Sequence, residues 1–266
     1  KTRIKGETYR MGLPTDFSAN MLEYVTRLGM TKTVETLLYD DPLPMGWFNR
    51  KIALGDAGHE WYFERPKDFE GFDMVFIVPT NKTGHDEFCR ALSAAGFDSI
   101  LDAIARRFEW DTGSVVHISL LGLSSGKTGG ERHTDFENTG VNAFNILVPL
   151  VLVDGSGPEL FVEDPPRDWV RGRLKYAENQ AVLVGSDAYH GSRPCDYRSG
   201  EERRFRFFLG LYIADVTDEN YERVMPEYYI AGYPHHDGQE LLRNKGNHWN
   251  SRDPSIKLPS FPALDG

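Results

Sequence analysis

The sequence is poor in cysteine and lacks long apolar runs. Its two cysteines, Cys89 and Cys195, lie far apart in a chain of 266 residues. That number excludes a disulfide-rich scaffold and a cysteine-ligated structural zinc site. One disulfide between them is an alternative, but two reduced thiols in an intracellular protein are the simpler interpretation. No apolar run reaches the roughly 18 residues of a membrane-spanning helix, and no secretory signal pattern opens the chain. We therefore expect a cytoplasmic protein with no membrane partner.

Positive charge is also in short supply. The chain has 30 Lys and Arg against 40 Asp and Glu, which gives a formal net charge of −10. Sequence-independent contact with phosphates needs a basic surface, so we expect no nucleic-acid partner. The chain is long enough to bury a substantial core. Without repeats or low-complexity segments, it is interpreted as a single domain over residues 1–266, and the oligomeric state stays open.

Residues 1–111 show a mixed, largely helical pattern. Apolar side chains recur at helical spacing over residues 18–29. Residues 86–108 favour two helical pieces with a break near Gly96. Between them, residues 73–79 (DMVFIVP) are typical of a strand. We expect this part to form a helical layer beside the rest of the chain.

Residues 112–216 change to a β pattern. Strand-like stretches without intervening helices are separated by Gly, Pro, Asp and Ser: SVVHISLLGL, NAFNILVPLVLV, GPELFVED, QAVLVGS and RFRFFLGLYIADV. Such a run favours an antiparallel sandwich or jelly roll. Residues 217–266 are rich in Pro, Gly, Asn and His and are interpreted as an irregular C-terminal extension. The predicted fold class is mainly β with α.

A histidine and an aspartate two residues apart follow a glycine-rich stretch, in SSGKTGGERHTDF. On an extended chain, the side chains of His133 and Asp135 point to the same side. An imidazole nitrogen and a carboxylate oxygen suit Fe(II), and His190, after a buried-looking strand, is the candidate third ligand. Two His and one carboxylate form a facial triad that leaves positions open on the metal. The alternative is a surface hydrogen-bonded pair with an unrelated turn histidine.

An arginine is expected near such a site if the iron-chelating cosubstrate is a dicarboxylate, because the planar guanidinium binds a carboxylate through two hydrogen bonds. The stretch RRFRFFLGLYI offers Arg204 and Arg206, which share one face of the predicted strand. We favour Arg204, and an exposed strand face is the alternative for either. His117 and Asn145, on the strands that flank the metal loop, are weaker candidates for contact with the cosubstrate. A hydrogen-bonded core histidine is the alternative for His117.

Taken in order, HTD, YHGSRP and RRFRFFLGLYI resemble the motif of the Fe(II)/2-oxoglutarate-dependent dioxygenase superfamily over roughly residues 112–216. That motif is His-X-Asp, then a distant His, then an Arg. The resemblance implies a double-stranded β-helix, with His133, Asp135 and His190 as metal ligands. It implies Fe(II), 2-oxoglutarate and O₂ as cofactors. One departure is that many members have Ser or Thr two residues after the arginine, where this chain has Arg206 or Phe208.

The resemblance also implies a reaction. A small molecule, derived from an amino acid or belonging to specialised metabolism, would be oxidised by hydroxylation, or by desaturation or ring closure. Asp135 argues against the halogenating branch, in which a small residue replaces the carboxylate. Two other functions compete. A cupin-type metalloenzyme that does not use 2-oxoglutarate shares the barrel but usually has more His ligands and no late arginine. A non-catalytic jelly-roll binding module would carry a degenerate metal site.

Overall fold

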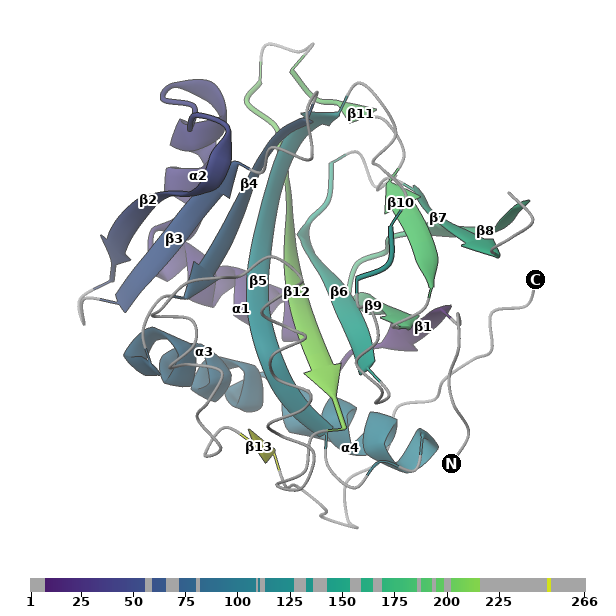
Figure 1. Cartoon of the computed structure of the whole chain (residues 1–266). Helices are drawn as coiled ribbons and strands as arrows, with labels where there is room; N and C mark the ends of the chain where they lie inside the picture. Colours follow the sequence, from purple (N-terminus) through teal and green to yellow (C-terminus); the bar gives the residue numbers. More distant parts are fainter. Residues whose placement is uncertain are drawn as a thin grey trace.

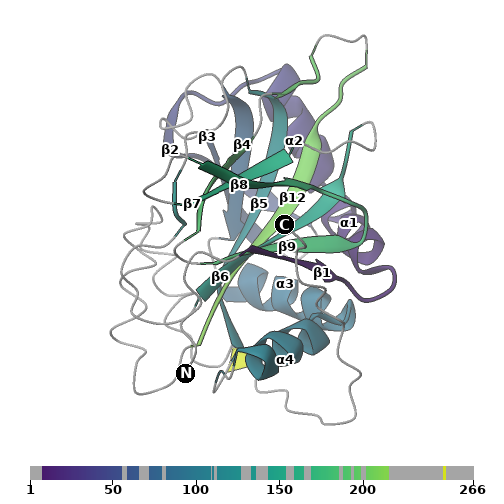
Figure 2. The ribbon, with the colours of Figure 1, turned by 90° about the vertical axis from the view of Figure 1, so that its right-hand side faces the viewer.

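The computed structural model describes residues 8–55, 59–65, 72–79, 82–108, 110, 113–126, 133–135, 143–153, 159–164, 169–185, 188–192, 195–198, 202–215 and 248–249. Figure 1 shows a large twisted sheet in the middle of the molecule, with a smaller sheet to its right. In the perpendicular view, β7 and β8 of the smaller sheet cross in front of the large one (Figure 2). The layers of the described chain are therefore helices, a main sheet and a second sheet.

The helices within the described residues are α1 (Phe17–Arg27), α2 (Met30–Tyr39), α3 (Lys82–Ala94) and α4 (Phe97–Arg107). Each buries one face, and in α1 this face includes Phe17, Met21 and Val25, spaced four residues apart. Gly29 and Gly96 lie at the α1–α2 and α3–α4 junctions with φ of +85° and +93°. Glycine adopts this left-handed conformation at little cost. The predicted break near Gly96 is present, whereas α2 was not predicted.

The main sheet is antiparallel and runs in the order β1-β9-β6-β12-β5-β4-β3-β2. The short strands β11 (Cys195–Asp196) and β13 (His248–Trp249) pair with the two ends of β5. The bounds of the longer strands are β1 (Thr8–Gly12), β2 (Gly46–Leu54), β3 (His59–Arg65), β4 (Phe72–Pro79), β5 (Gly113–Gly126), β6 (Ala143–Val151), β9 (Gln180–Gly185) and β12 (Arg206–Ala214).

The second sheet has the order β10-β7-β8, formed by β7 (Glu159–Asp164), β8 (Trp169–Lys175) and β10 (Tyr189–Ser192). An isolated bridge between His133 and His190 extends it beyond β10. From β5 onward the chain therefore alternates between the sheets: β5, the bridge residue, β6, then β7 and β8, then β9, β10 and β12. This alternation is the connectivity of a jelly roll, so the predicted fold class is confirmed.

Two apolar cores lie on opposite faces of the main sheet. Phe207 and Leu209 of β12 are fully buried in the core shared with the helices. Phe208 lies between them in the chain and points the other way, where it packs with Leu160 and Leu174 of the second sheet. A fully buried side chain of this size contributes about 1.5–3 kcal/mol. The second face is therefore the inside of the jelly roll, where a ligand site is expected.

Helix α2 packs on β4 and β5. The approach is close because Gly122 of β5 has no side chain, and a Cβ there would clash with Cγ1 of Val34. Helix α1 packs on β6, α3 packs on β3 and β4, and α4 packs on β5. Helix α2 is thereby fixed against β4 and β5 of the main sheet.

The N-terminal layer contains more strand than the sequence indicated. Strand β1 pairs with β9, and β2 and β3 extend the main sheet beyond β4. Strand β3 has the alternating burial of a half-covered strand, but its polar residues obscure the pattern in the sequence. The predicted C-terminal extension lies outside the described residues, apart from 248–249. Among the described helices, none has the length and apolarity needed to cross a bilayer.

Candidate metal centre

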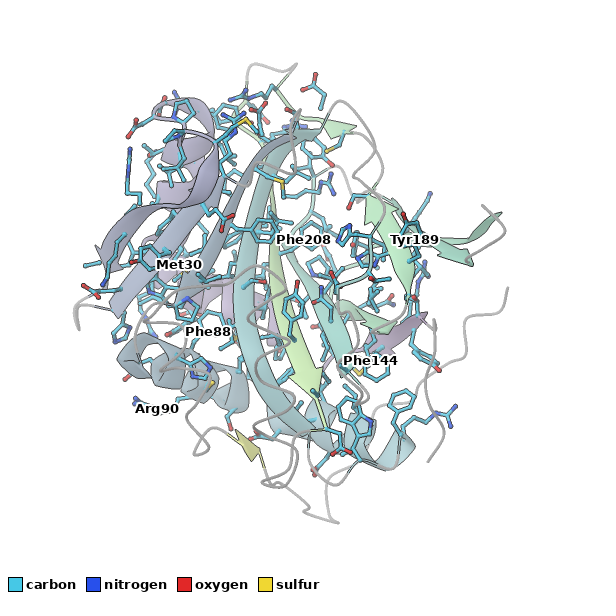
Figure 3. All side chains as sticks on the ribbon, in the orientation of Figure 1. Met30, Phe88, Arg90, Phe144, Tyr189 and Phe208 are labelled. Carbon is cyan, nitrogen blue, oxygen red and sulfur yellow. The ribbon has the colours of Figure 1, made fainter. Side chains whose placement is uncertain are left out.

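Backbone pairing brings the two predicted histidine ligands together. The amide nitrogen of each donates to the carbonyl oxygen of the other, at 2.9 Å in both directions between His133 and His190. This pair of hydrogen bonds holds His133 against β10, although the two residues are far apart in the chain. Asp135 follows His133 by two residues, so its carboxylate lies on the same side. Figure 3 labels Phe208 on the main sheet and Tyr189, the neighbour of His190 in the chain, on the second sheet.

The three side chains converge. Nε2 of His133 lies 3.5 Å from Oδ1 of Asp135, and Nε2 of His190 lies 3.6 Å from Oδ2. Two ligand atoms that each lie about 2.1 Å from one metal can be no more than about 4.2 Å apart. All the candidate ligand atoms of the group lie within 4.8 Å of one another. The three side chains can therefore bind one metal ion after only a small movement of the ligand atoms toward one another.

The orientation of His190 favours metal binding. Its Nδ1 lies 2.9 Å from the carbonyl oxygen of Ala188, which can only accept a hydrogen bond. Nδ1 is therefore the donor in this bond, and Nε2 is the ring atom that faces Asp135. Histidine ligands of metals are commonly oriented by such a bond from the other ring nitrogen. The side chain of His190 is 6 % exposed, whereas that of His133 is 41 % exposed.

Asp135 is ionised despite its burial. Burial alone raises the pKa of this carboxyl, but His190, His133 and Asn145 outweigh that effect and lower the pKa to about 2. Nδ2 of Asn145 donates to Oδ2 of Asp135 at 2.9 Å. The sequence suggests Asn145 as a contact for the cosubstrate, which stays a prediction. In the structure its amide nitrogen contacts the candidate ligand carboxylate and orients Asp135.

Asn145 also lies close to Gly210 of β12. Its Oδ1 is buried and has no hydrogen-bond partner among the described residues. A Cβ added at Gly210 would lie 2.7 Å from Oγ of Ser119 and 3.8 Å from Oδ1 of Asn145. Gly210 therefore lets the Ser119 hydroxyl lie close to the backbone of β12, where it donates to the carbonyl oxygen of Gly210 at 3.5 Å. Buried acceptors such as Oδ1 of Asn145 normally have a hydrogen-bond donor beside them.

Arg206, the first residue of β12, is 1 % exposed. Its Nη2 lies 2.7 Å from Sγ of Cys195, and its guanidinium lies over the rings of Tyr197 and Phe208, at 5.0 and 5.9 Å from their centroids. Its Nε has no hydrogen-bond partner, and none of its contacts among the described residues is a carboxylate. A buried cation without an anionic partner is costly. Arg206 therefore lacks a compensating carboxylate among its described contacts.

Arg204, the residue we favoured from the sequence, occupies a different environment. Strand β12 begins at Arg206, so the two-residue alternation that was to place both arginines on one face does not extend back to Arg204. Its side chain is 46 % exposed, and its Nη2 pairs with Glu202 at 2.7 Å. The side chain of His117 lies outside the described residues, and only its backbone, paired with Tyr212, is described.

Tyr176 was missed by sequence reasoning. It lies just after β8, is 6 % exposed and packs its ring against Phe208 at 4.7 Å between centroids. Burial raises the pKa of its hydroxyl most, Arg206 lowers it and Asp135 raises it. Tyr176 is therefore close enough to both Asp135 and Arg206 for their charges to act on its hydroxyl. No motif in the sequence identifies it, because its role depends on the packing of the two sheets.

The comparisons with known proteins give similar folds and no matching sequence family. No family model and no curated protein matches the chain. A solved structure of SnoN, a non-haem alpha-ketoglutarate-dependent epimerase from nogalamycin biosynthesis, is 12 % identical, with a TM-score of 0.47 over 80 % of this chain and 79 % of that one. AviO1 from Streptomyces viridochromogenes Tue57 is 12 % identical, with a TM-score of 0.48 over 79 % and 90 %. A prolyl hydroxylase from Trichoplax adhaerens, solved with a hypoxia inducible factor peptide, is 13 % identical, with a TM-score of 0.48 over 83 % and 86 %. We therefore base the functional proposal on the site geometry.

Proposed function

We propose that this protein is a non-haem Fe(II)/2-oxoglutarate-dependent oxygenase that oxidises a small molecule. The observation that carries the proposal is the convergence of His133, Asp135 and His190 on the side of the main sheet where Arg206 is buried. The described contacts of Arg206 include no carboxylate. The first three residues provide the ligands of a facial triad. The fourth provides the cation that a dicarboxylate cosubstrate requires at its far end.

Strand register supports the placement of Arg206 on the metal's side. Residues two apart on a strand share a face, so Arg206, Phe208, Gly210 and Tyr212 of β12 point the same way. Tyr212 pairs directly with Asn145, and the amide of Asn145 reaches Asp135. The guanidinium and the metal ligands therefore border one space inside the jelly roll.

The donor set fits Fe(II) better than it fits a structural zinc ion. Two imidazole nitrogens and one carboxylate oxygen are typical of non-haem Fe(II) sites, whereas structural zinc is usually closed by four ligands that include Cys. The two free cysteines, Cys89 and Cys195, do not belong to the group of candidate ligands. Bound Fe(II) would supply activation of O₂ together with the oxidative decarboxylation of 2-oxoglutarate.

The residues of this chain have separate tasks in that chemistry. His190 is held in a metal-binding orientation by the carbonyl of Ala188, and Asp135 is kept ionised and oriented by Asn145. Arg206 binds the far carboxylate of 2-oxoglutarate. Phe208, with a ring packed between the second sheet and the guanidinium, keeps water from that pair. Exclusion of water strengthens the attraction between the two charges.

The substrate is proposed to be a small molecule oxidised by hydroxylation, desaturation or ring closure. The test is release of succinate from 2-oxoglutarate by the purified protein with Fe(II), ascorbate and O₂, over a panel of amino acids and specialised metabolites. We expect a slow basal release that a substrate accelerates. Iron-dependent oxidation that proceeds without 2-oxoglutarate would favour the cupin-type alternative, and no iron binding would favour the binding module.

A further inference from the structure

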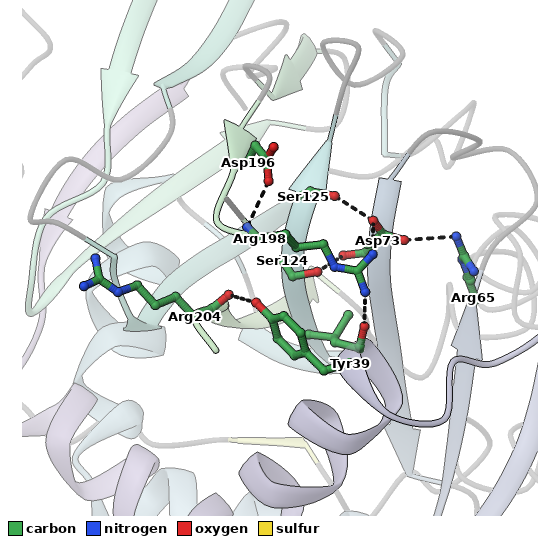
Figure 4. A network of polar contacts seen from close by, with 9 residues as sticks. Tyr39, Arg65, Asp73, Ser124, Ser125, Asp196, Arg198 and Arg204 are labelled. Atoms are coloured by element: carbon green, nitrogen blue, oxygen red, sulfur yellow. Dashed lines mark hydrogen bonds and ion pairs between the residues drawn. The ribbon is translucent and has the colours of Figure 1, made fainter. Parts of the chain in front are cut away.

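The loop that leads into Arg206 is held by the C-terminal end of α2. On one arm of the loop, Arg198 donates from Nη2 to the carbonyl oxygen of Leu38. On the other arm, the carbonyl oxygen of Arg204 accepts a hydrogen bond from the hydroxyl of Tyr39. The residues that make these bonds are drawn in Figure 4. One helix end therefore holds both arms of the same loop.

The chemistry of the helix end explains this preference for arginine. The last carbonyl groups of a helix lack partners within it, and the helix dipole makes this end negative. The guanidinium groups of Arg198 and Arg203 lie over the ring of Tyr39, at 5.3 and 5.9 Å from its centroid. Arg203 also pairs with Asp40 at 2.6 Å. Two cations from the loop are thus attracted to one helix terminus and one aromatic ring.

Asp73 of β4 connects this end of α2 to the main sheet. Its carboxylate accepts from Nη1 of Arg198 at 2.9 Å, from Nη2 of Arg65 at 3.2 Å and from Oγ of Ser125 at 2.7 Å. Its side chain is 25 % exposed, so these bonds are only partly screened by water. Ser125 belongs to β5, next to the point where β11 pairs. Arg198 is therefore anchored by the helix and by the sheet together.

The same loop supplies two of the side chains that contact the guanidinium of Arg206. Cys195 and Tyr197, immediately before Arg198, contact the guanidinium of Arg206 through Sγ and through the ring. The amide nitrogen of Tyr197 donates to the carbonyl oxygen of Ser124 at 2.9 Å. Movement of Arg198 would shift Cys195 and Tyr197, and with them their contacts to Arg206. Movement of Arg204 would shift the backbone two residues before Arg206. A binding group must be held within a fraction of an ångström to act at full strength.

We propose that Arg198 and Tyr39 are positioning residues for Arg206, and that the C-terminal end of α2 sets the affinity for the dicarboxylate cosubstrate. The inference rests on the proposed function and assigns to the N-terminal layer a role in the site. Neither residue touches the cosubstrate. Both act through the loop, so their effect depends on the presence of the Arg206 guanidinium.

The test is anaerobic titration of 2-oxoglutarate into the Fe(II)-loaded protein, followed by the visible charge-transfer absorption of the chelate. Arg198→Ala should raise Kd about tenfold, less than the roughly 10²-fold that a misplaced group can cost. Tyr39→Phe removes only the hydroxyl and should raise Kd about threefold. Arg50→Ala is the matched control, because Arg50 pairs with Asp41 just beyond α2, and this pair does not involve the described residues of the loop. It should leave Kd unchanged.

A double-mutant cycle separates positioning from plain stability. In an Arg206→Lys background, Arg198→Ala should change Kd less than about twofold, because the guanidinium that it positions is gone. The same factor in both backgrounds, or a Kd for both single variants equal to that of wild type, would overturn the inference. If Arg198→Ala does not fold, Arg198→Lys replaces it in the cycle. Lysine keeps the positive charge but lacks the planar guanidinium that binds Leu38 and Asp73 at the same time. Wild-type protein that loads iron but does not bind 2-oxoglutarate would instead contradict the proposed function.

Discussion

Replacement of Arg206 by Met should affect the stability of the fold and the binding of 2-oxoglutarate in opposite directions. Met has a similar length and no charge. In the protein without cosubstrate, the substitution removes a cation that is 1 % exposed and has no carboxylate among its described contacts. Replacing such a buried charge by an apolar group is often neutral or stabilising. We therefore expect Tm to stay the same or to rise.

The effect on cosubstrate binding should have the opposite sign. Removing one partner of a hydrogen-bonded charge pair that is shielded from water costs about 2–5 kcal/mol. At about 1.4 kcal/mol per tenfold, the lower limit corresponds to a rise in Kd for 2-oxoglutarate of about 30-fold. Because Arg206 is almost fully buried, solvent screening does not reduce this figure to that of a surface pair. The KM of the primary substrate should change little.

The assay is the dependence of succinate release on 2-oxoglutarate concentration, together with thermal unfolding of the protein without cosubstrate. Arg204→Met is the matched control, because the Arg204 side chain is 46 % exposed and pairs with Glu202. It should change the KM for 2-oxoglutarate less than about twofold. The reverse ranking would transfer the role to Arg204. If neither variant weakens 2-oxoglutarate, the cosubstrate is not bound as a dicarboxylate, and the cupin-type interpretation becomes the better one.

Three further predictions concern the metal group. His190→Ala should abolish turnover and iron binding while thermal unfolding stays cooperative, and near-normal iron content in the variant would show that His190 is not a ligand. Asn145→Ala removes the donor to Asp135 and should weaken iron binding about 10–100-fold, as measured by competition with a chelator, with iron affinity equal to that of wild type as the contrary result. The pKa of Asp135 is lowered to about 2 in the folded protein, so its stabilising contribution of about 2 kcal/mol is present above the ordinary carboxyl pKa and is lost as pH falls through the folded value. Metal-free Asp135→Asn should therefore unfold less steeply with acid than wild type below pH ~4, and identical acid-unfolding curves would exclude this linkage.

Much of the jelly roll was predictable because the local sequence of its strands is typical of β structure. The stretches around β5, β6, β9 and β12 are apolar and rich in β-branched or aromatic residues, and turn residues separate them. Strand β3 and helix α2 were not predicted. Half of β3 is polar because one face of it lies away from the helices, and α2 follows α1 after only two turn residues. Their packing, rather than their local sequence, defines them.

The convergence of His133, Asp135 and His190 could be predicted from the sequence, whereas the different environments of Arg204 and Arg206 could not. A spacing of two residues on an extended chain is a local property, so His133 and Asp135 could be paired from the sequence. The choice between Arg204 and Arg206 depends on where β12 begins, and that is decided by its pairing with Leu123 of β5 at Arg206. The place of Tyr176 between the two sheets likewise depends on tertiary packing.

The most direct test of the central claim is the anaerobic titration of 2-oxoglutarate into Fe(II)-loaded protein, with His190→Ala in parallel. The account predicts that wild-type protein binds one iron and develops a saturating charge-transfer absorption with one equivalent of 2-oxoglutarate, whereas the variant develops none. Wild-type protein that holds iron without this absorption, or a variant that develops it as wild type does, would contradict the assignment of these three residues to a single iron site.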